Sequence, residues 1–183
     1  MCEIELGKRF VNGGEDELEE VIDIYGKKLL RYATSILCNY QDGEDIVQNV
    51  FISAYENRRN FGGKHLSAWL YKITYNHCIN HLKKRKLLFF SEITGVQEET
   101  VESFNDDTIS DNVLKALKKL KVKDRALVYG RILNEQSYEE LSHIFGSSPD
   151  ALRKQYERAK KKLFEYLSAE GYKYCEEMRK ELV

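Results

Sequence analysis

Residues 69–86 combine aromatic rings, amides and cations at spacings that suit ligand binding on a helix. The polar members recur every three or four positions and form one helical stripe, Lys72, Asn76, Asn80 and Lys83. Aromatic rings accompany the stripe at Trp69, Tyr71 and Tyr75. Rings stack on unpaired bases with about 1–3 kcal/mol per base, and an asparagine can read the edge of an extruded base. The segment predicts binding of single-stranded nucleic acid; the alternative is that Trp69 and one tyrosine belong to the core and the lysines are solvated.

Two histidines in the same segment have the spacing of metal ligands. His77 and His81 are four positions apart, with Cys78 between them. No acidic residue occurs from residue 57 to residue 91 to complete a site. Phosphate-binding glycine loops, nucleophile elbows and paired-carboxylate helices do not occur either. The sequence therefore predicts no metal, no cofactor and no enzyme; a metal-dependent enzyme is a third alternative, which elemental analysis would test.

A second group of functional residues follows paired helix start and stop signals. Ser137 and Glu140 form a capping box, and Gly146 has the position of a left-handed helix end. Only two residues later, Ser148 and Pro149 begin another helix. Two helices joined by so short a turn predict a helix-turn-helix motif; the alternative is an αα-hairpin with a solvated basic face.

The helix after Pro149 has an apolar face and a cationic face. The apolar positions are spaced by four, three and four residues: Leu152, Tyr156, Ala159 and Leu163. On the opposite side, Arg153 and Arg158 could make bidentate contacts to guanine. Neighbouring lysines suit phosphates, namely Lys154, Lys160, Lys161 and Lys162. Glu157 could accept from cytosine or pair with Lys161.

Charge is segregated along the chain, although the net charge is only −1. Residues 57–86 carry 8 basic and no acidic residues, and residues 112–163 carry 13 basic and 6 acidic residues. An acidic stretch, residues 87–111, separates these blocks with 7 acids and no base. Two basic blocks of this size predict contact with a polyanion; solvated helix faces are the alternative.

Helical periodicity predicts an all-α fold with two small helical domains joined by a flexible acidic linker. Three helices are expected before the linker, over about 18–37, 42–55 and 66–86, the second capped by Asp42. We predict domain 1 over 1–86, the linker over 87–110, the helix-turn-helix domain over 111–170 and a tail over 171–183. Apolar runs of at most four residues predict no membrane insertion. The absence of a signal peptide and the scattered cysteines favour a cytoplasmic location: Cys2, Cys38, Cys78 and Cys175.

Two segments resemble parts of bacterial RNA polymerase sigma factors. Residues 42–55 (DGEDIVQNVFISAY), Phe61-Gly62-Gly63 and residues 68–76 (AWLYKITYN) are similar to their promoter-melting domain. Residues 137–149 (SYEELSHIFGSSP), with Arg158 to Leu163 (RAKKKL) beyond them, are similar to their second DNA-binding domain. A short chain with only these two segments resembles the extracytoplasmic-function group.

The resemblance implies three sets of contacts. Docking on the clamp coiled coil of the polymerase largest subunit would involve Asp42, Asp45, Ile46, Gln48, Asn49 and Phe51. Val50 belongs to the same helix. The melted minus-ten element would contact Lys64, Trp69, Tyr71, Lys72, Tyr75, Asn76, Asn80 and Lys83. The duplex minus-thirty-five element would contact Ser148, Asp150, Ala151, Arg153, Lys154, Glu157, Arg158 and Lys161.

The resemblance also implies partners: the polymerase clamp and flap, promoter DNA and an anti-sigma protein, with a monomer when free. Several residues depart from the family pattern. Asn49 replaces a usual glutamate, Gln155 replaces a common arginine, and residues 149–151 replace Val-Gly-Thr. These departures leave the preferred base sequence open. A stand-alone dimeric helix-turn-helix regulator is the alternative, and it predicts palindromic sites.

Overall fold

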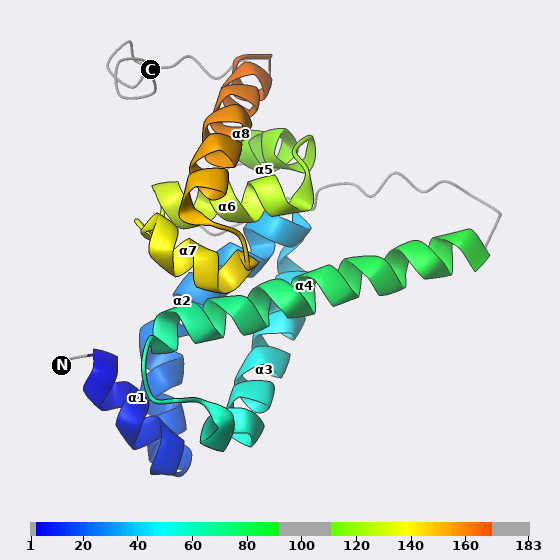
Figure 1. The fold of residues 1–183 in the computed structure, drawn as a ribbon. Coiled ribbons are helices and arrows are strands. Elements are labelled where there is room, and N and C mark those ends of the chain that lie inside the picture. Colours follow the sequence, from blue (N-terminus) through cyan, green and yellow to red (C-terminus); the bar gives the residue numbers. More distant parts are fainter. Residues whose placement is uncertain (1–2, 92–110, 170–183) are drawn as a thin grey trace.

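The computed structural model describes residues 3–91 and 111–169, and these residues form helices and no strand. The first domain contains α1 (Glu3–Asn12), α2 (Glu15–Leu37), α3 (Tyr40–Asn57), a 3₁₀ turn (Arg58–Asn60) and α4 (Leu66–Ser91). The second contains α5 (Asp111–Lys118), α6 (Val122–Ile132), α7 (Tyr138–Phe145) and α8 (Pro149–Ala169). The predicted all-α fold with two helical domains is confirmed (Figure 1). Most of the predicted linker and the tail lie outside the described residues, but α4 continues as far as Ser91.

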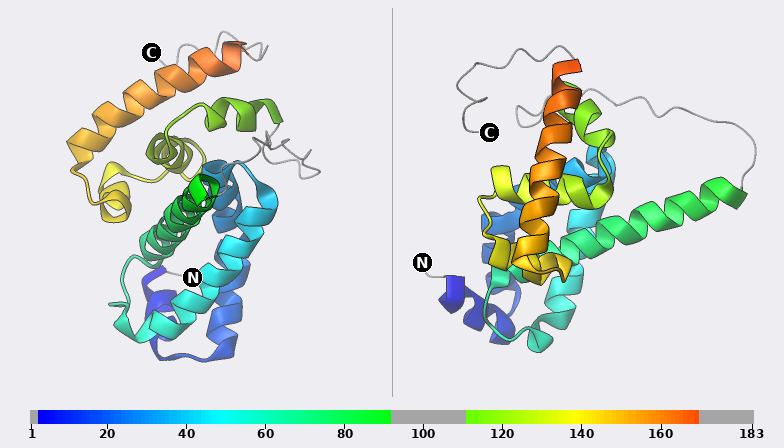
Figure 2. Two further views of the ribbon diagram at one scale, coloured as in Figure 1. Left: turned by 90° about the vertical axis from the view of Figure 1, so that its right-hand side faces the viewer. Right: turned by 45° about the horizontal axis from the view of Figure 1, so that its top comes forward.

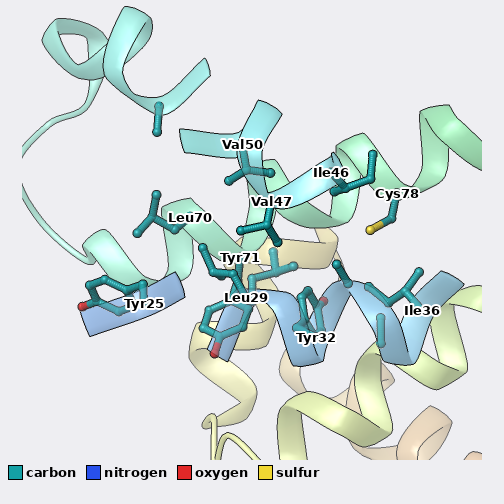
Figure 3. Packing of buried hydrophobic residues seen from close by; sticks show 14 of the residues in the cluster. Tyr25, Leu29, Tyr32, Ile36, Ile46, Val47, Val50, Leu70, Tyr71 and Cys78 are labelled. Carbon is teal, nitrogen blue, oxygen red and sulfur yellow. The ribbon is translucent and has the colours of Figure 1, made fainter. Parts of the chain in front are cut away.

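The core of the first domain lies where α2, α3 and α4 meet (Figure 3). Leu29 and Ile36 of α2 are fully buried against Val50 of α3 and Leu70 of α4. Each such aliphatic side chain contributes about 1.5–3 kcal/mol when it leaves water. The three helices are therefore held along their apolar stripes, which leaves the opposite side of α4 free to carry polar residues.

The first turn of α3 corrects one expectation. The predicted cap was Asp42, but the helix begins at Tyr40 and its cap is Asn39. The Asn39 side-chain oxygen accepts a hydrogen bond from the Asp42 backbone N–H at 2.9 Å. Asp42 thus lies inside the first turn, where its carboxylate still faces the positive end of the helix dipole.

An N-terminal helix that the sequence did not predict supports the start of α4. Leu6 and Phe10 of α1 are buried in the main core. A Glu3 carboxylate oxygen accepts a hydrogen bond from the Ser67 backbone N–H at 2.7 Å, close to the first residue of α4. This carboxylate accepts a backbone N–H in the first turn of α4, as a capping side chain does, and it ties α1 to the start of α4.

The loop before α4 has a tight glycine contact. Gly63 has φ +71°, in the left-handed region that favours glycine. A Cβ atom on Gly7 of α1 would lie 2.9 Å from the Gly63 carbonyl oxygen, so α1 and the loop can meet only because residue 7 lacks a side chain. The loop therefore holds a fixed position at the start of α4.

The second domain contains the predicted helix-turn-helix. The capping box is confirmed: Glu140 N–H donates to Ser137 Oγ, and Ser137 N–H donates to the Glu140 carboxylate. Gly146 ends α7 with φ +61°, and the Ala151 N–H donates to Ser148 Oγ at the start of α8. Leu152, Ala159 and Leu163 are buried as expected, and Tyr156 is half-buried.

The two domains pack closely against each other through two helix pairs. α6 lies on α2, and α7 lies on α4 (Figures 1 and 2). The Tyr32 ring of α2 is fully buried, with its centroid 5.0 Å from that of Tyr71 and 5.8 Å from that of Tyr129 in α6. One apolar cluster consequently runs from the first domain into the second.

A buried cation lies in this inter-domain contact. Arg125 of α6 is only 8% exposed, and its Nη1 donates to Cys38 Sγ at 2.9 Å. Cys38 ends α2 in a left-handed conformation with φ +53°, so the guanidinium faces the negative end of that helix dipole. The Arg125 Nε atom has no hydrogen-bond partner in the described part of the chain. Burial raises the pKa of the Cys38 thiol, and Arg125 opposes that shift.

Candidate nucleic-acid interface

The predicted polar stripe occupies the exposed side of α4. Lys72, Asn76, Asn80 and Lys83 are all exposed, and their spacing places them along one line of the helix. Lys64, in the loop before α4, is exposed as well. The structure thus brings cations and amide groups together on a surface about 16 Å long, the length of the eleven helical steps from Lys72 to Lys83.

The predicted aromatic contacts of α4 have three different environments. Tyr71 is only 2% exposed and packs edge-on against Tyr32, so it belongs to the core in this conformation. Trp69 is half-buried: Phe61 stacks on it at 4.7 Å, and Phe10 meets it at 6.5 Å. The Trp69 ring is therefore held rigidly, with part of its surface open to a ligand.

Tyr75 contacts the second domain. Its ring is half-buried and meets Phe145 at the end of α7 with centroids 5.0 Å apart. Burial raises the pKa of the Tyr75 hydroxyl. His143 of α7 also stacks on His65, in the loop before α4, with ring centroids 5.9 Å apart. The second domain thus covers one side of the predicted aromatic platform.

The histidines of α4 contact α3 and do not form a metal site. His77 Nε2 lies 3.3 Å from Ser53 Oγ, and burial lowers the pKa of His77. His81 Nε2 lies 3.4 Å from the Asp42 carboxylate, which also accepts a hydrogen bond from Arg85 at 3.1 Å. Across the described ranges, no group of three or more potential ligands is close enough to hold a metal.

The predicted recognition surface of α8 faces solvent. All eight predicted residues are exposed: Ser148, Asp150, Ala151, Arg153, Lys154, Glu157, Arg158 and Lys161. Glu157 pairs with Lys160 at 3.2 Å instead of with Lys161, which corrects that alternative. Arg158 Nε donates to the Lys154 carbonyl at 3.2 Å, so its side chain lies along the helix.

A basic cleft extends this surface toward α6. It has a volume of about 210 Å³ and is lined by Lys121, Asp124, Gln155, Arg158, Ala159 and Lys162. The Gln155 amide donates to the Asp124 carboxylate at 2.6 Å, which leaves three cations around the opening. Sequence patterns did not single out Lys121, because it precedes α6 and joins the cleft only through folding.

The predicted docking residues of α3 divide into surface and core. Asp45, Gln48 and Asn49 are exposed, whereas Ile46 and Phe51 are buried. Asn49 donates its amide to the Asp45 carbonyl one turn earlier. The exposed residues can contact a partner directly, and the buried ones hold α3 on the domain.

An apolar groove between α2 and α3 adds residues that the sequence did not reveal. It has a volume of about 770 Å³ and includes Gln48 and Phe51 among its lining residues. Ile52 lies in its wall and is 56% exposed, and Ile22 of α2 is 38% exposed on the other side. Exposed isoleucines on a helix pair indicate a surface that a partner can cover.

No described helix has the length and apolar character that crossing a membrane requires.

Two family models match the chain. The model of Sigma-70 region 2 matches residues 21–87, and that of Sigma-70 region 4 matches residues 110–163. Together they span about two thirds of the chain and coincide with α2 to α4 and α5 to α8. Neither match supports the alternative of a stand-alone regulator.

Curated relatives and solved structures agree with these models. The chain is 28% identical to the ECF RNA polymerase sigma factor SigW of Bacillus subtilis, over 75% of this chain and 81% of that protein. It is 24% identical to the RNA polymerase sigma factor CarQ of Myxococcus xanthus, over 87% and 94%.

Solved structures show the same fold at lower identity. CnrH, solved with the cytosolic domain of CnrY, has a TM-score of 0.69 at 20% identity over 91% of this chain and 97% of that one. The sigma factor RpoE of Bartonella quintana, solved with the anti-sigma factor NepR, has a TM-score of 0.72 at 22% identity over 82% and 96%. With both family regions present in order, the chain belongs to the sigma-70 family of RNA polymerase sigma factors, in its extracytoplasmic-function group.

Proposed function

We propose that this sigma factor divides promoter recognition between α4 and α8 while the α2–α3 surface docks on polymerase. The observation that supports the division is that two exposed cationic surfaces lie on separate domains, one interleaved with amides and rings and one on a helix-turn-helix. The first suits unpaired bases and the second suits duplex DNA. Sigma factors are not an enzymatic family, so promoter melting would be driven by binding energy alone.

The melted strand is proposed to lie along α4. Lys72 and Lys83 would pair with phosphates at the two ends of the stripe, and Asn76 would read the edge of an extruded base between them. Trp69 offers the remaining open surface of its ring for stacking. Such contacts offset the few kcal/mol that unstacking a base step costs. Tyr71 is left out of this set because it is buried.

The upstream duplex is proposed to be read by α8. Arg153 and Arg158 are the candidates for base edges, since guanidinium groups bind guanine in a bidentate manner. Lys154 and Lys161, with the basic cleft around Lys121, would bind phosphates and contribute no sequence information. Each DNA module is weak alone, and tethering both to one polymerase raises their effective concentration.

Polymerase is proposed to bind α3 through Asp45, Gln48 and Asn49, with the adjoining groove receiving apolar side chains. Asp42 takes part indirectly, because Arg85 and His81 already engage its carboxylate. Ile52 and Ile22 extend the contact beyond the residues that the sequence suggested. The polymerase flap would contact the second domain.

A regulatory partner is also proposed. Of the structural neighbours named above, CnrH was solved with the cytosolic domain of CnrY, and RpoE was solved with NepR, which is named as an anti-sigma factor. By analogy, an anti-sigma protein would hold this chain in the cytoplasm, away from polymerase. We expect the free chain to be a monomer, which size-exclusion chromatography with and without core enzyme tests.

Run-off transcription with core bacterial polymerase on a promoter library tests the proposal. The full chain should select a two-part promoter and bind core enzyme with one-to-one stoichiometry. A chain that never alters the start sites chosen by core enzyme, and that elutes as a dimer with palindromic binding sites, would overturn the assignment of roles. The variant Ile52→Asp should lose core binding, whereas Ile4→Asp on α1, also an exposed isoleucine, should retain it.

A further inference from the structure

One tyrosine at the start of α7 lies beneath two guanidinium groups from different helices. The Cζ atom of Arg153 in α8 is 5.3 Å from the centroid of the Tyr138 ring. The Cζ atom of Arg131 in α6 is 4.8 Å from the same centroid. Both distances fall within cation–π range. Tyr138 thus joins three helices at the point where the recognition helix presents its first arginine.

The Tyr138 ring is itself held in place. Arg131 Nη1 donates to the Gln136 carbonyl, which ties the end of α6 to the connection before α7. Tyr156 of α8 meets Tyr138 edge-on with centroids 6.3 Å apart. The Ser137 capping box fixes the backbone next to the ring. These contacts make Tyr138 a rigid support whose orientation does not depend on Arg153.

Arg153 needs such a support. Its side chain is exposed on α8, and an unrestrained arginine loses rotamer entropy when it is fixed on a ligand. A ring that already restrains the guanidinium reduces that loss at the moment of binding. We propose that Tyr138 is a positioning residue that presents the Arg153 guanidinium to a base edge of duplex DNA. The inference rests on the proposed function of α8.

The position of the Arg153 guanidinium affects the choice between DNA sequences, because only a base contact distinguishes them. Loss of the ring should leave phosphate contacts intact and reduce discrimination at the single position that Arg153 reads. A cation–π contact at an exposed site corresponds to about a two- to fivefold change in that discrimination. General binding to DNA should change little.

The test uses the full chain with core polymerase and a promoter library randomised in the upstream duplex element. Tyr138→Phe keeps the ring and should retain the selectivity of the native chain. Tyr138→Leu removes the ring and should reduce the discrimination between bases at one position by about two- to fivefold. Tyr166→Leu is the matched control, since Lys119 lies 5.7 Å over that α8 tyrosine, away from the recognition residues. In an Arg153→Ala background, Tyr138→Leu should have no further effect on selectivity.

The outcomes separate this inference from the function on which it rests. A chain that directs no core-dependent transcription overturns the proposed function. Normal transcription with equal selectivity in the Phe and Leu variants overturns only the role of Tyr138, as does an additive effect in the Arg153→Ala background.

Should the Leu variant fail to fold, NMR of the unaltered chain decides. The Arg153 side-chain protons, assigned with Arg153→Lys, should be shifted upfield by the ring current of Tyr138. Upfield shifts that persist when a selected duplex binds support the positioning role, whereas resonances that are unshifted in the free chain, or that lose their shift on binding, overturn it.

Discussion

Tyr75 of α4 and Phe145 of α7 meet edge to face, with ring centroids 5.0 Å apart and ring planes at 84°. Tyr75 is one of the side chains assigned to the melted strand, and Phe145 belongs to the domain assigned to the upstream duplex. A base cannot occupy the side of the Tyr75 ring that Phe145 covers. In this conformation, the second domain and an unpaired base would therefore compete for the same side of the Tyr75 ring.

Phe145→Ala should open this contact and raise the affinity of the free chain for a single-stranded oligonucleotide. Aromatic pairs are worth about 0.5–1.5 kcal/mol beyond the area they bury, which corresponds to a two- to tenfold change. Fluorescence anisotropy measures the affinity, and Leu133→Ala, at an exposed position after α6, is the control. Equal affinity of the native chain and both variants would show that the pair does not restrict DNA binding.

Asn76→Ala should slow the formation of open complexes while leaving the binding of core polymerase intact. Loss of one base contact amounts to about 1–3 kcal/mol, so a reduction of about fivefold or more is expected. Permanganate footprinting of unpaired thymines measures melting. Asn57→Ala on α3 provides a matched control, because that amide is exposed and donates to the Ser53 carbonyl of its own helix. Undiminished melting by the Asn76 variant would remove this residue from the site.

Arg153→Ala should reduce selectivity between DNA sequences, whereas Lys161→Ala should reduce affinity for all of them. The arginine variant should lose about 1–3 kcal/mol of discrimination at one base pair, because it loses a base contact. The lysine variant should weaken binding to all sequences equally and reduce the salt slope by about one, because it loses a phosphate contact. Holoenzyme binding over a range of salt concentrations distinguishes them, and identical behaviour of the two would contradict the assignment.

The free energy of unfolding should fall at alkaline pH, in part because the thiol of Cys78 is buried. Burial raises the pKa of this thiol from 9.0 to about 12, so the folded state favours the neutral form. The stabilisation is complete below pH 9 and is lost as the pH rises toward 12, because the unfolded chain releases the proton first. Denaturant unfolding from pH 8 to pH 11 should show a smaller pH dependence for Cys78→Ala than for the native chain. Parallel curves would contradict this account.

Gly43→Ala should destabilise the first domain. A Cβ atom there would lie 2.7 Å from Thr34 Oγ1 on α2, and crowding of this kind costs about 1–3 kcal/mol. Gly26→Ala is the matched control within α2, since its nearest neighbour, Ile22 Cγ2, would lie at 3.8 Å. That control should be stabilised by about 0.4–1 kcal/mol. Thermal unfolding of both variants measures the difference, and a stable Gly43 variant would mean that α2 and α3 can move apart at no cost.

Local chemistry explains why the helix-turn-helix could be predicted and the α3 start could not. Ser137, Glu140 and Gly146 act through backbone atoms within four residues, so the sequence alone specifies them. The sequence predicted Asp42 as the cap of α3, whereas the hydrogen bond from the Asp42 backbone N–H identifies Asn39 as the cap. Both residue types are favourable caps, so the residue type at position 42 did not reveal that the helix begins earlier.

Other parts of the site depend on contacts between distant segments. Spacing predicted the stripe of Lys72 and Asn76, which is confirmed as one exposed line. It could not show that Tyr71 turns inward, because Tyr32 comes from another helix. The packing of α7 on α4 could not be predicted from the sequence either, since the apolar face of a helix does not reveal which helix will cover it.

The guanidinium of Arg125 limits how firmly the two domains can hold each other. When α6 packs on α2, this group loses its hydration and gains contacts with a thiol and a helix end, and no carboxylate of residues 3–91 or 111–169 is recorded as its partner. A charge in such surroundings regains hydration as soon as the helices part. We therefore expect polymerase or promoter DNA to separate α6 from α2 at a lower cost in binding energy than an entirely apolar contact would require.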